Sequence, residues 1–192
     1  MTIVQTESNS FATAFLHDNG SVTTDVAWGD PEEDGDSRAV QHLLKDVTEL
    51  FSTYGAFAAL KTDGTVVTWG NQVRGGNSSA VQHRLTAITT IIATRRAFAA
   101  LKADGTVITW GDPDYGGNSN TVQHRLTNVS AIAASASAFA ALKADGTVVT
   151  WGDPEDGGDS NAVQEKLINV QTIIPHEDGF TAITSDGTEI SW

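Results

Sequence analysis

The 192-residue chain has no cysteine, so disulfide bonds, thiolate metal sites and a cysteine nucleophile are all excluded. Positive charge is scarce as well, because 11 lysines and arginines stand against 24 aspartates and glutamates, which gives a formal net charge of -13. Phosphate backbones are bound by clustered Lys and Arg, and an acidic surface repels them. We therefore expect no nucleic acid among the partners.

Long apolar runs are also missing, and no stretch approaches the length of a membrane-spanning segment. The first residues, MTIVQTESNSFATAF, lack the basic region, the apolar run and the cleavage pattern of a signal peptide. The sequence does not fix a compartment. We expect a protein without a membrane span that is either cytoplasmic or exported by a non-classical route.

What the chain does contain is one repeat written five times. Its five tryptophans stand 41 residues apart, at Trp28, Trp69, Trp110, Trp151 and Trp192. Periods of about 20 to 50 residues are typical of solenoids and propellers, in which neighbouring units stack to bury their apolar faces. With no linker between repeats, we predict a single domain, 1–192, with units of approximately 1–28, 29–69, 70–110, 111–151 and 152–192.

Each unit predicts a three-stranded antiparallel meander. The run FAALKADGTVITWG from Phe98 is nearly repeated from Phe57 and Phe139, and a looser version starts at Phe180. Its Asp-Gly step lies between two stretches rich in apolar and β-branched residues, which is a strong hairpin signal. Short β-rich runs just upstream, such as TTIIAT, supply the third strand.

The segments between meanders predict short helical connectors. In SSAVQHRLTAI the spacing of Val81, Leu85 and Ile88 places them on one helical face, and Ser79 with Gln82 has the form of a capping box. A helix of about two turns is the first interpretation. An irregular connector that buries the same apolar residues is the alternative.

Five meanders and four connectors give a mostly β repeat fold. The missing connector predicts a β-propeller-like closed ring, in which the strand near Ile3 lies beside the strand that ends at Trp192. An open solenoid arc is the alternative, and its two exposed ends would need capping or would self-associate. In the first unit Gly20 to Trp28 spans eight residues where Gly64 to Trp69 spans five, which predicts a bulge or a longer strand in SVTTDVAW.

The repeated tryptophans are interpreted as core residues. A large ring facing small residues of the next unit, such as Ala58 and Ala59, is what packing between units requires. The alternative is an aromatic surface on which a sugar or a base stacks.

The run DGTVVTWG, with an apolar strand before it and glycines after it, resembles the repeat of the regulator of chromosome condensation family. The resemblance recurs over the whole chain and is strongest in 57–70, 98–111 and 139–152. It implies a β-propeller, which has seven blades in that family. It also implies an interaction platform, and one family member catalyses guanine-nucleotide exchange on a small GTPase. The repeat here is shorter than the family's usual unit, and GGNSSAVQHRL replaces the family's G-Q-L-G segment.

Acidic loops follow several of the tryptophan strands, and DPEEDGDS and DPEDGGDS are the richest in carboxylates. Oxygen ligands at the first and third places and Gly at the sixth resemble an EF-hand loop, but Gln41 and Gln164 occupy the twelfth place, where a bidentate Glu is expected. Solvated turns before a helix explain the same residues. If calcium binds, the expected ligands are Asp30, Glu32, Asp34, Asp36, Asp153, Glu155, Asp156 and Asp159.

Four residues break the repeat pattern with side chains that are common in binding hot spots. Arg95 and Arg96 stand where the neighbouring units have Tyr-Gly and Ala-Ser, Arg74 is the only basic residue at its loop position, and Tyr115 is the only aromatic one. We expect these four to anchor a partner. Sequence drift at exposed turns is the alternative.

Catalytic signatures are missing: we find no G-x-S-x-G, no phosphate loop and no H-E-x-x-H. His42, His83 and His124 lie one unit apart, too far to share a tetrahedral metal. The sequence favours a non-catalytic scaffold without cofactors other than calcium, which binds a protein or a glycan through its loops. The alternatives are a calcium-dependent adhesion or toxin-associated module and an exchange-factor-like regulator of a small GTPase.

Overall fold

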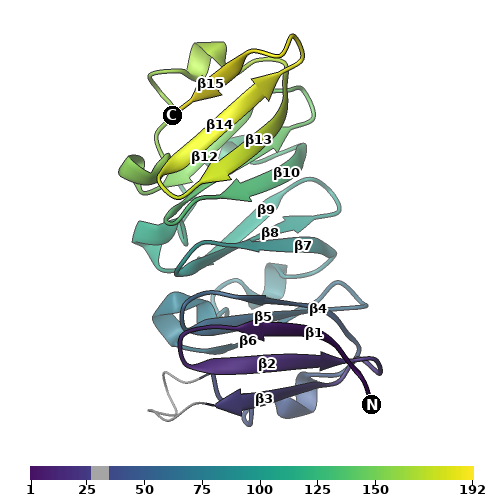
Figure 1. The fold of residues 1–192 in the computed structure, drawn as a ribbon. Helices are drawn as coiled ribbons and strands as arrows, with labels where there is room; N and C mark the ends of the chain where they lie inside the picture. Colours follow the sequence, from purple (N-terminus) through teal and green to yellow (C-terminus); the bar gives the residue numbers. More distant parts are fainter. Residues whose placement is uncertain (27–34) are drawn as a thin grey trace.

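The computed structural model describes residues 1–26 and 35–192. Five separate three-stranded antiparallel sheets follow one another along the chain, each made of three consecutive strands. The sheets stack on one another from the N-terminal sheet to the C-terminal sheet (Figure 1). We number them as units one to five. In the part of the chain that is described, no helix has the length and apolar character to cross a membrane.

The strands fall into three sets by their position in the unit. The first strands of neighbouring units contact one another and form the inner edge of the stack: β1 (Ile3–Ser8), β4 (Val47–Ser52), β7 (Ile88–Ala93), β10 (Val129–Ala134) and β13 (Val170–His176). The middle strands are β2 (Ala12–His17), β5 (Ala56–Lys61), β8 (Ala97–Lys102), β11 (Ala138–Lys143) and β14 (Gly179–Thr184). The outer strands are β3 (Val22–Val26), β6 (Val66–Gly70), β9 (Val107–Gly111), β12 (Val148–Gly152) and β15 (Glu189–Ser191).

The Asp-Gly steps form the predicted hairpins between middle and outer strands. In unit three the carboxylate of Asp104 accepts hydrogen bonds from the backbone N–H and the hydroxyl of Thr106, at 2.9 and 2.6 Å. Gly105 follows with φ of 75°, a left-handed conformation that glycine adopts without strain. The Thr106 hydroxyl, and next its N–H, lower the pKa of Asp104. The hairpin prediction is confirmed.

The connectors are helical but shorter than two turns. Each is a single turn of 3-10 helix: η1 (Gln41–Leu43), η3 (Gln82–Arg84), η5 (Gln123–Arg125) and η7 (Gln164–Lys166). The capping box predicted at Ser79 is wrong, because the amide of Gln82 instead accepts from the Ser78 hydroxyl and donates to the carbonyl of Val66. Leu85 is fully buried, so the apolar pattern was interpreted correctly.

The tryptophans of units two to four are buried core residues, as predicted. The Trp110 side chain is 4% exposed, stacks on Phe98 with ring centroids 5.2 Å apart, and donates from Nε1 to the carbonyl of Gly75 at 3.0 Å. Both rings share a cluster with Ala58 of unit two. They therefore face the preceding unit, which corrects the predicted direction. Trp28 lies outside the described residues.

Unit one differs from the others, but not in its hairpin. β3 pairs with β2 without a register shift, so the bulge or longer strand predicted in SVTTDVAW is wrong over the described residues. Thr13 and Asp25 pair at the place where Phe57 and Trp69 pair in unit two. The outward face of unit one is consequently polar where an inner unit presents two large rings.

The array is the open arc, the alternative to the closed ring. The N- and C-terminal sheets lie at opposite ends of the stack (Figure 1), so the strands of Ile3 and Trp192 are not neighbours, contrary to the prediction. The end faces explain why. Asp25 replaces a tryptophan in unit one, and Glu189 in unit five replaces the valine at Val148 in unit four. Packing these faces together would bury carboxylates, which costs free energy unless each finds a partner.

One position before the inner strands carries backbone strain that can be relieved. Asp46, Ala87, Asn128 and Asn169 all have positive φ, between 54° and 58°, and Asp and Asn tolerate this conformation better than Ala. We expect Ala87→Asn to raise the free energy of unfolding by roughly 1 kcal/mol. Urea denaturation measures it, with Asn128→Ala expected to lower stability by a similar amount. Equal urea midpoints for Ala87→Asn and the parent protein would show that Ala87 carries no such strain.

Candidate functional site

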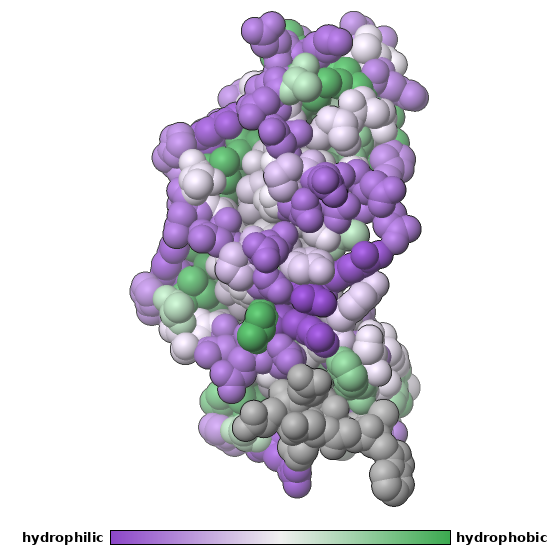
Figure 2. Space-filling view, turned by 90° about the vertical axis from the view of Figure 1, so that its left-hand side faces the viewer, coloured by the Kyte–Doolittle hydropathy of each residue, from purple (hydrophilic) through white to green (hydrophobic). Residues whose placement is uncertain are grey.

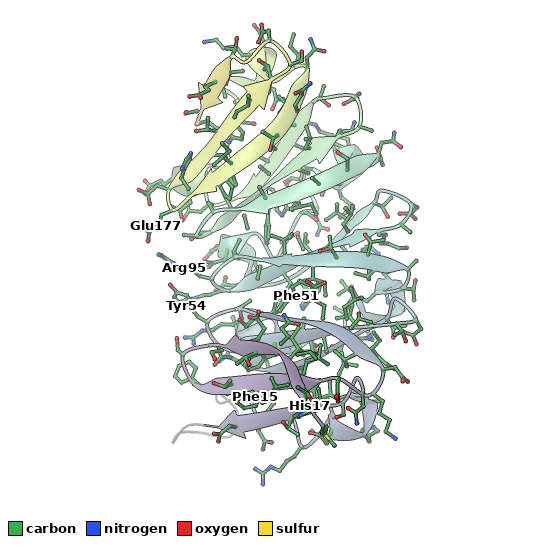
Figure 3. All side chains as sticks on the ribbon, turned by 45° about the vertical axis from the view of Figure 1, so that its right-hand side comes forward. Phe15, His17, Phe51, Tyr54, Arg95 and Glu177 are labelled. Atoms are coloured by element: carbon green, nitrogen blue, oxygen red, sulfur yellow. The ribbon has the colours of Figure 1, made fainter. Side chains whose placement is uncertain are left out.

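Short loops join the inner and middle strand of every unit. We call them the tip loops: 9–11, 53–55, 94–96, 135–137 and 177–178. Their residues at one repeat position form a backbone ladder, in which the N–H of Tyr54 donates to the carbonyl of Arg95 at 2.8 Å, Arg95 to Ala136 at 3.0 Å, and Ala136 to Glu177 at 3.1 Å. Figure 3 shows Tyr54, Arg95 and Glu177 along one edge of the stack.

The first tip residue fixes both the tip loop and the segment that leaves the outer strand. In unit three the Thr94 hydroxyl accepts from the N–H of Ala97 and donates to the carbonyl of Tyr115 at 2.9 Å. In unit two Thr53 donates in the same way to the carbonyl of Arg74. Arg74 and Tyr115 therefore occupy equivalent places beside their tip loops. Two predicted binding residues thus lie along the same edge of the stack.

Arginines lie over aromatic rings along this edge of the stack. The guanidinium of Arg96 lies 4.7 Å from the ring centroid of Tyr115 and 3.6 Å from the carboxylate of Asp112. The guanidinium of Arg74 lies 5.8 Å from the ring centroid of Phe11 in unit one. Such cation–π pairs hold flexible arginine side chains in defined positions. The result is a row of positioned cations on an acidic protein.

Arg95 lies between an aromatic ring and a carboxylate. Its guanidinium is 5.7 Å from the ring centroid of Tyr54, and its Nη2 is 2.5 Å from Oε1 of Glu177. The pKa of Arg95 is raised, mainly by the neighbouring Tyr54 and to a smaller extent by Glu177. The Arg95 and Glu177 side chains are 38% and 73% exposed, so both remain open to a partner.

An open hollow of about 450 Å³ lies beside Arg95 and Tyr54. It is formed by the ends of three inner strands and by four tip loops. Apart from the Arg95 cation and the Tyr54 ring, its lining is rich in small hydroxyl side chains: Ser8, Ser10, Ser52, Thr53, Thr94 and Ser135. A lining of this kind offers hydrogen bonds to a polar side chain from a partner.

The four residues predicted for binding thus lie along the edge of the stack that carries the tip loops. Among them, only Arg96 and Tyr115 contact each other directly. Sequence reasoning did not select Phe11, Tyr54 or Glu177, which complete the pairs around the arginines. The signal was present in the sequence. Tyr54 and Glu177 occupy the same repeat position as Arg95, so reading that position down all units would have found them.

Three of the predicted calcium ligands, Asp30, Glu32 and Asp34, lie outside the described residues. Asp36 forms an ion pair with Arg38 at 2.6 Å. The hydrogen bond from the Arg38 side chain, and next that from its backbone N–H, lower the pKa of Asp36. This carboxylate is therefore engaged within its own turn.

In the DPEDGGDS loop the carboxylates serve different turns. Asp153 accepts from the N–H of Glu155 at 3.0 Å and caps η6 (Pro154–Asp156), while Asp159 accepts from the N–H of Asn161 at 2.9 Å. Over the ranges 1–26 and 35–192, no three His, Asp or Glu side chains converge on a point where a metal ion could sit. Calcium binding by the acidic loops stays a prediction.

The stack of three-stranded sheets matches solved repeat proteins. The chain superimposes on Prp20p from Saccharomyces cerevisiae with a TM-score of 0.59 and 16% identity, over 99% of this chain and 57% of that one. For yeast RCC1 (Prp20) bound to Kap60 the values are 0.61 and 19%, over 98% and 55%. The fold is RCC1-like.

The ectodomain of the receptor kinase CR4 from Physcomitrella patens gives a TM-score of 0.58 and 15% identity, over 99% of this chain and 52% of that one. The chain thus spans about half the length of these structures, and at such identities the likeness shows the fold alone. No family model and no curated protein matches the sequence.

Proposed function

We propose that this protein is a non-catalytic scaffold that binds another protein through the tip loops of units one to three and the adjoining residues Arg74 and Tyr115. One observation carries the proposal. The middle strands β5, β8 and β11 have the identical sequence AFAALK, whereas the tip loops directly before them read TYG, TRR and SAS. The supporting frame is constant and the side chains it presents differ.

Exposure alone does not account for this difference. The exposed His-Arg pair of the connector is the same at 83–84 and at 124–125, although the flanking connectors read QHLL, at 41–44, and QEKL, at 164–167. Two of the four connectors thus keep the same exposed residues, whereas the tip loops of units two, three and four all differ from one another. Tip loops that differ on identical supporting strands are what a surface adapted to a particular, non-repeating partner would show.

The chemistry of the surface favours a protein over a glycan or a nucleic acid. Arg and Tyr are enriched in the hot spots of protein interfaces. The rings of Phe11, Tyr54 and Tyr115 each have an arginine over one face, which leaves less ring surface on which a sugar or a base could stack. Figure 2, seen from the side that carries the tip loop of unit five, shows a mostly hydrophilic surface with scattered hydrophobic residues.

The solved structures of similar fold are compatible with this role. Prp20p is described by its binding properties to Gsp1p and histones, and yeast RCC1 is seen bound to Kap60. Their partners are proteins, which supports a scaffold role for the fold. The identity of a partner does not transfer at this level of similarity, because function resides in particular sites rather than in folds.

A capture experiment with charge-matched variants tests the proposal. Three of the six arginines lie in or beside the tip loops, and the other three lie in or near the connectors. Two triple variants therefore lose the same charge. The tip variant is Arg74→Ala/Arg95→Ala/Arg96→Ala, and the connector variant is Arg38→Ala/Arg84→Ala/Arg125→Ala. Proteins from a lysate of the source cells are captured on each immobilised chain and quantified. We expect a partner held by the parent and by the connector variant, and reduced at least about tenfold on the tip variant.

Thermal melting checks that both variants are folded. Two results would contradict the proposal. If the tip variant retains the same proteins in the same amounts, the binding surface lies elsewhere. If the parent protein captures nothing above a blocked resin, the scaffold role itself is wrong.

A further inference from the structure

The ion pair between Arg95 and Glu177 joins units three and five, which are not neighbours in the stack. The other ion pairs among the described residues, such as Arg96 with Asp112, join groups that are close together in the sequence. In a repeat array each unit normally contacts only its neighbours. Here Arg95 reaches beyond unit four, where the equivalent tip residue is the small Ala136, to the tip loop of unit five.

The ion pair between Arg95 and Glu177 is weak enough to open readily. Both side chains are exposed, and an exposed ion pair favours its closed form by about fivefold at most. The Tyr54 ring, 5.7 Å from the Arg95 guanidinium, comes from unit two, so this contact does not involve Glu177. Glu177 therefore pairs with a guanidinium that is held in place by other contacts, and another carboxylate could bind this guanidinium instead.

The surroundings of Arg95 suit a singly charged carboxylate. The hollow beside it is lined by hydroxyl groups, and the Ser52 hydroxyl at its edge already donates to the carboxylate of Glu7 at 3.0 Å. A doubly charged phosphate would meet that negative charge with only one guanidinium to balance it, because Arg95 is the one arginine in the lining. A carboxylate needs only the single cation and the hydroxyl donors.

From this geometry, and resting on the proposed function, we infer that Arg95 is the docking point for an Asp or Glu side chain of the partner. The partner's carboxylate replaces Glu177 on the Arg95 guanidinium and enters the hollow between the tip loops. Glu177 acts as an internal competitor that lowers the affinity for acidic segments. A partner that has no carboxylate at this place does not displace Glu177, and Arg95 stays paired with it.

The experiment uses a short end-capped peptide with a single glutamate, its glutamine counterpart and its phosphoserine counterpart, titrated into the full chain. Binding is followed by the NMR signals of the backbone amides in the tip loops around the hollow, and, in the chains that keep Arg95, also by its Nε–H. We expect Glu177→Gln to tighten binding of the glutamate peptide by about two- to fivefold, because the competitor is removed. Arg95→Ala should abolish that binding, and the glutamine peptide should bind none of the variants.

A neighbouring substitution separates competition from general charge. Asp178 lies next to Glu177 in the exposed tip loop, and Asp178→Asn removes the same charge without freeing Arg95. Tightening by Asp178→Asn equal to that by Glu177→Gln would overturn the inference, and so would binding of the phosphoserine peptide alone. The titration involves no cellular partner. Its failure therefore leaves the capture experiment intact, and failure of the capture experiment leaves the titration interpretable.

Discussion

Trp110→Ala is expected to lower the free energy of unfolding by about 3–5 kcal/mol, the range for truncation of a large core aromatic. The ring is 4% exposed in the central unit and stacks on Phe98. Its loss opens a cavity between units two and three and leaves the carbonyl of Gly75 without its indole donor. Because the units depend on their interfaces, the two halves of the array should lose their mutual support.

Urea denaturation followed by far-UV circular dichroism measures the change. Trp110→Phe serves as a partial variant, which refills much of the cavity but cannot donate to Gly75, and we expect an intermediate loss. Val73→Ala is the surface control, since Val73 is 63% exposed, and should change stability by less than about 0.5 kcal/mol. A loss below about 1 kcal/mol for Trp110→Ala would show that the ring does not hold the interface.

Gly116→Ala is expected to cost about 2–5 kcal/mol, from left-handed strain and overpacking together. Gly116 has φ of 87°, and a Cβ there would lie 2.6 Å from the ring of Phe139 in β11. Real Cβ atoms do not approach a ring so closely, so the ring or the backbone has to move. The glycine is required both for its conformation and for the close approach of one unit to the next.

Gly187→Ala isolates the conformational part of this cost. Gly187 has nearly the same φ, 85°, but no atom lies within 4 Å of the position a Cβ would take. This variant should lose only about 1–2 kcal/mol, which is the strain of the left-handed conformation. Equal losses for the two variants, measured by urea denaturation, would mean that the contact with Phe139 is unimportant.

The strands and hairpins could be predicted from the sequence because their signals are local. An Asp-Gly step between β-branched runs specifies a hairpin without reference to the rest of the chain, and the 41-residue period carries that unit across the whole chain. The connectors show the limit of such reasoning. Leu85 and Ile88 have helical spacing, but a turn of three residues is sufficient to bury them between two units.

Closure of the array and the composition of the candidate surface depend on contacts between distant residues. Whether the ends meet is decided by Asp25 and Glu189, whose importance appears only after strand pairing has placed them on outward faces. Arg95 and Glu177 are 82 residues apart, and nothing local to either one predicts their pairing. The repeat pattern identified Arg95 as an exception, but only the structure, in which the tip loops lie along one edge of the stack, shows that Glu177 is its partner.

The polar end faces also determine how an array like this one can change its length. The interface of unit two with unit three and that of unit three with unit four are built from the same phenylalanine, tryptophan and alanine positions. A copied inner unit would therefore find matching surfaces on both sides. A unit appended beyond Asp25 or Glu189 would instead meet a carboxylate where it needs an apolar contact. The chain can lengthen by insertion in the middle, and an insertion between units three and five would carry Glu177 further from Arg95.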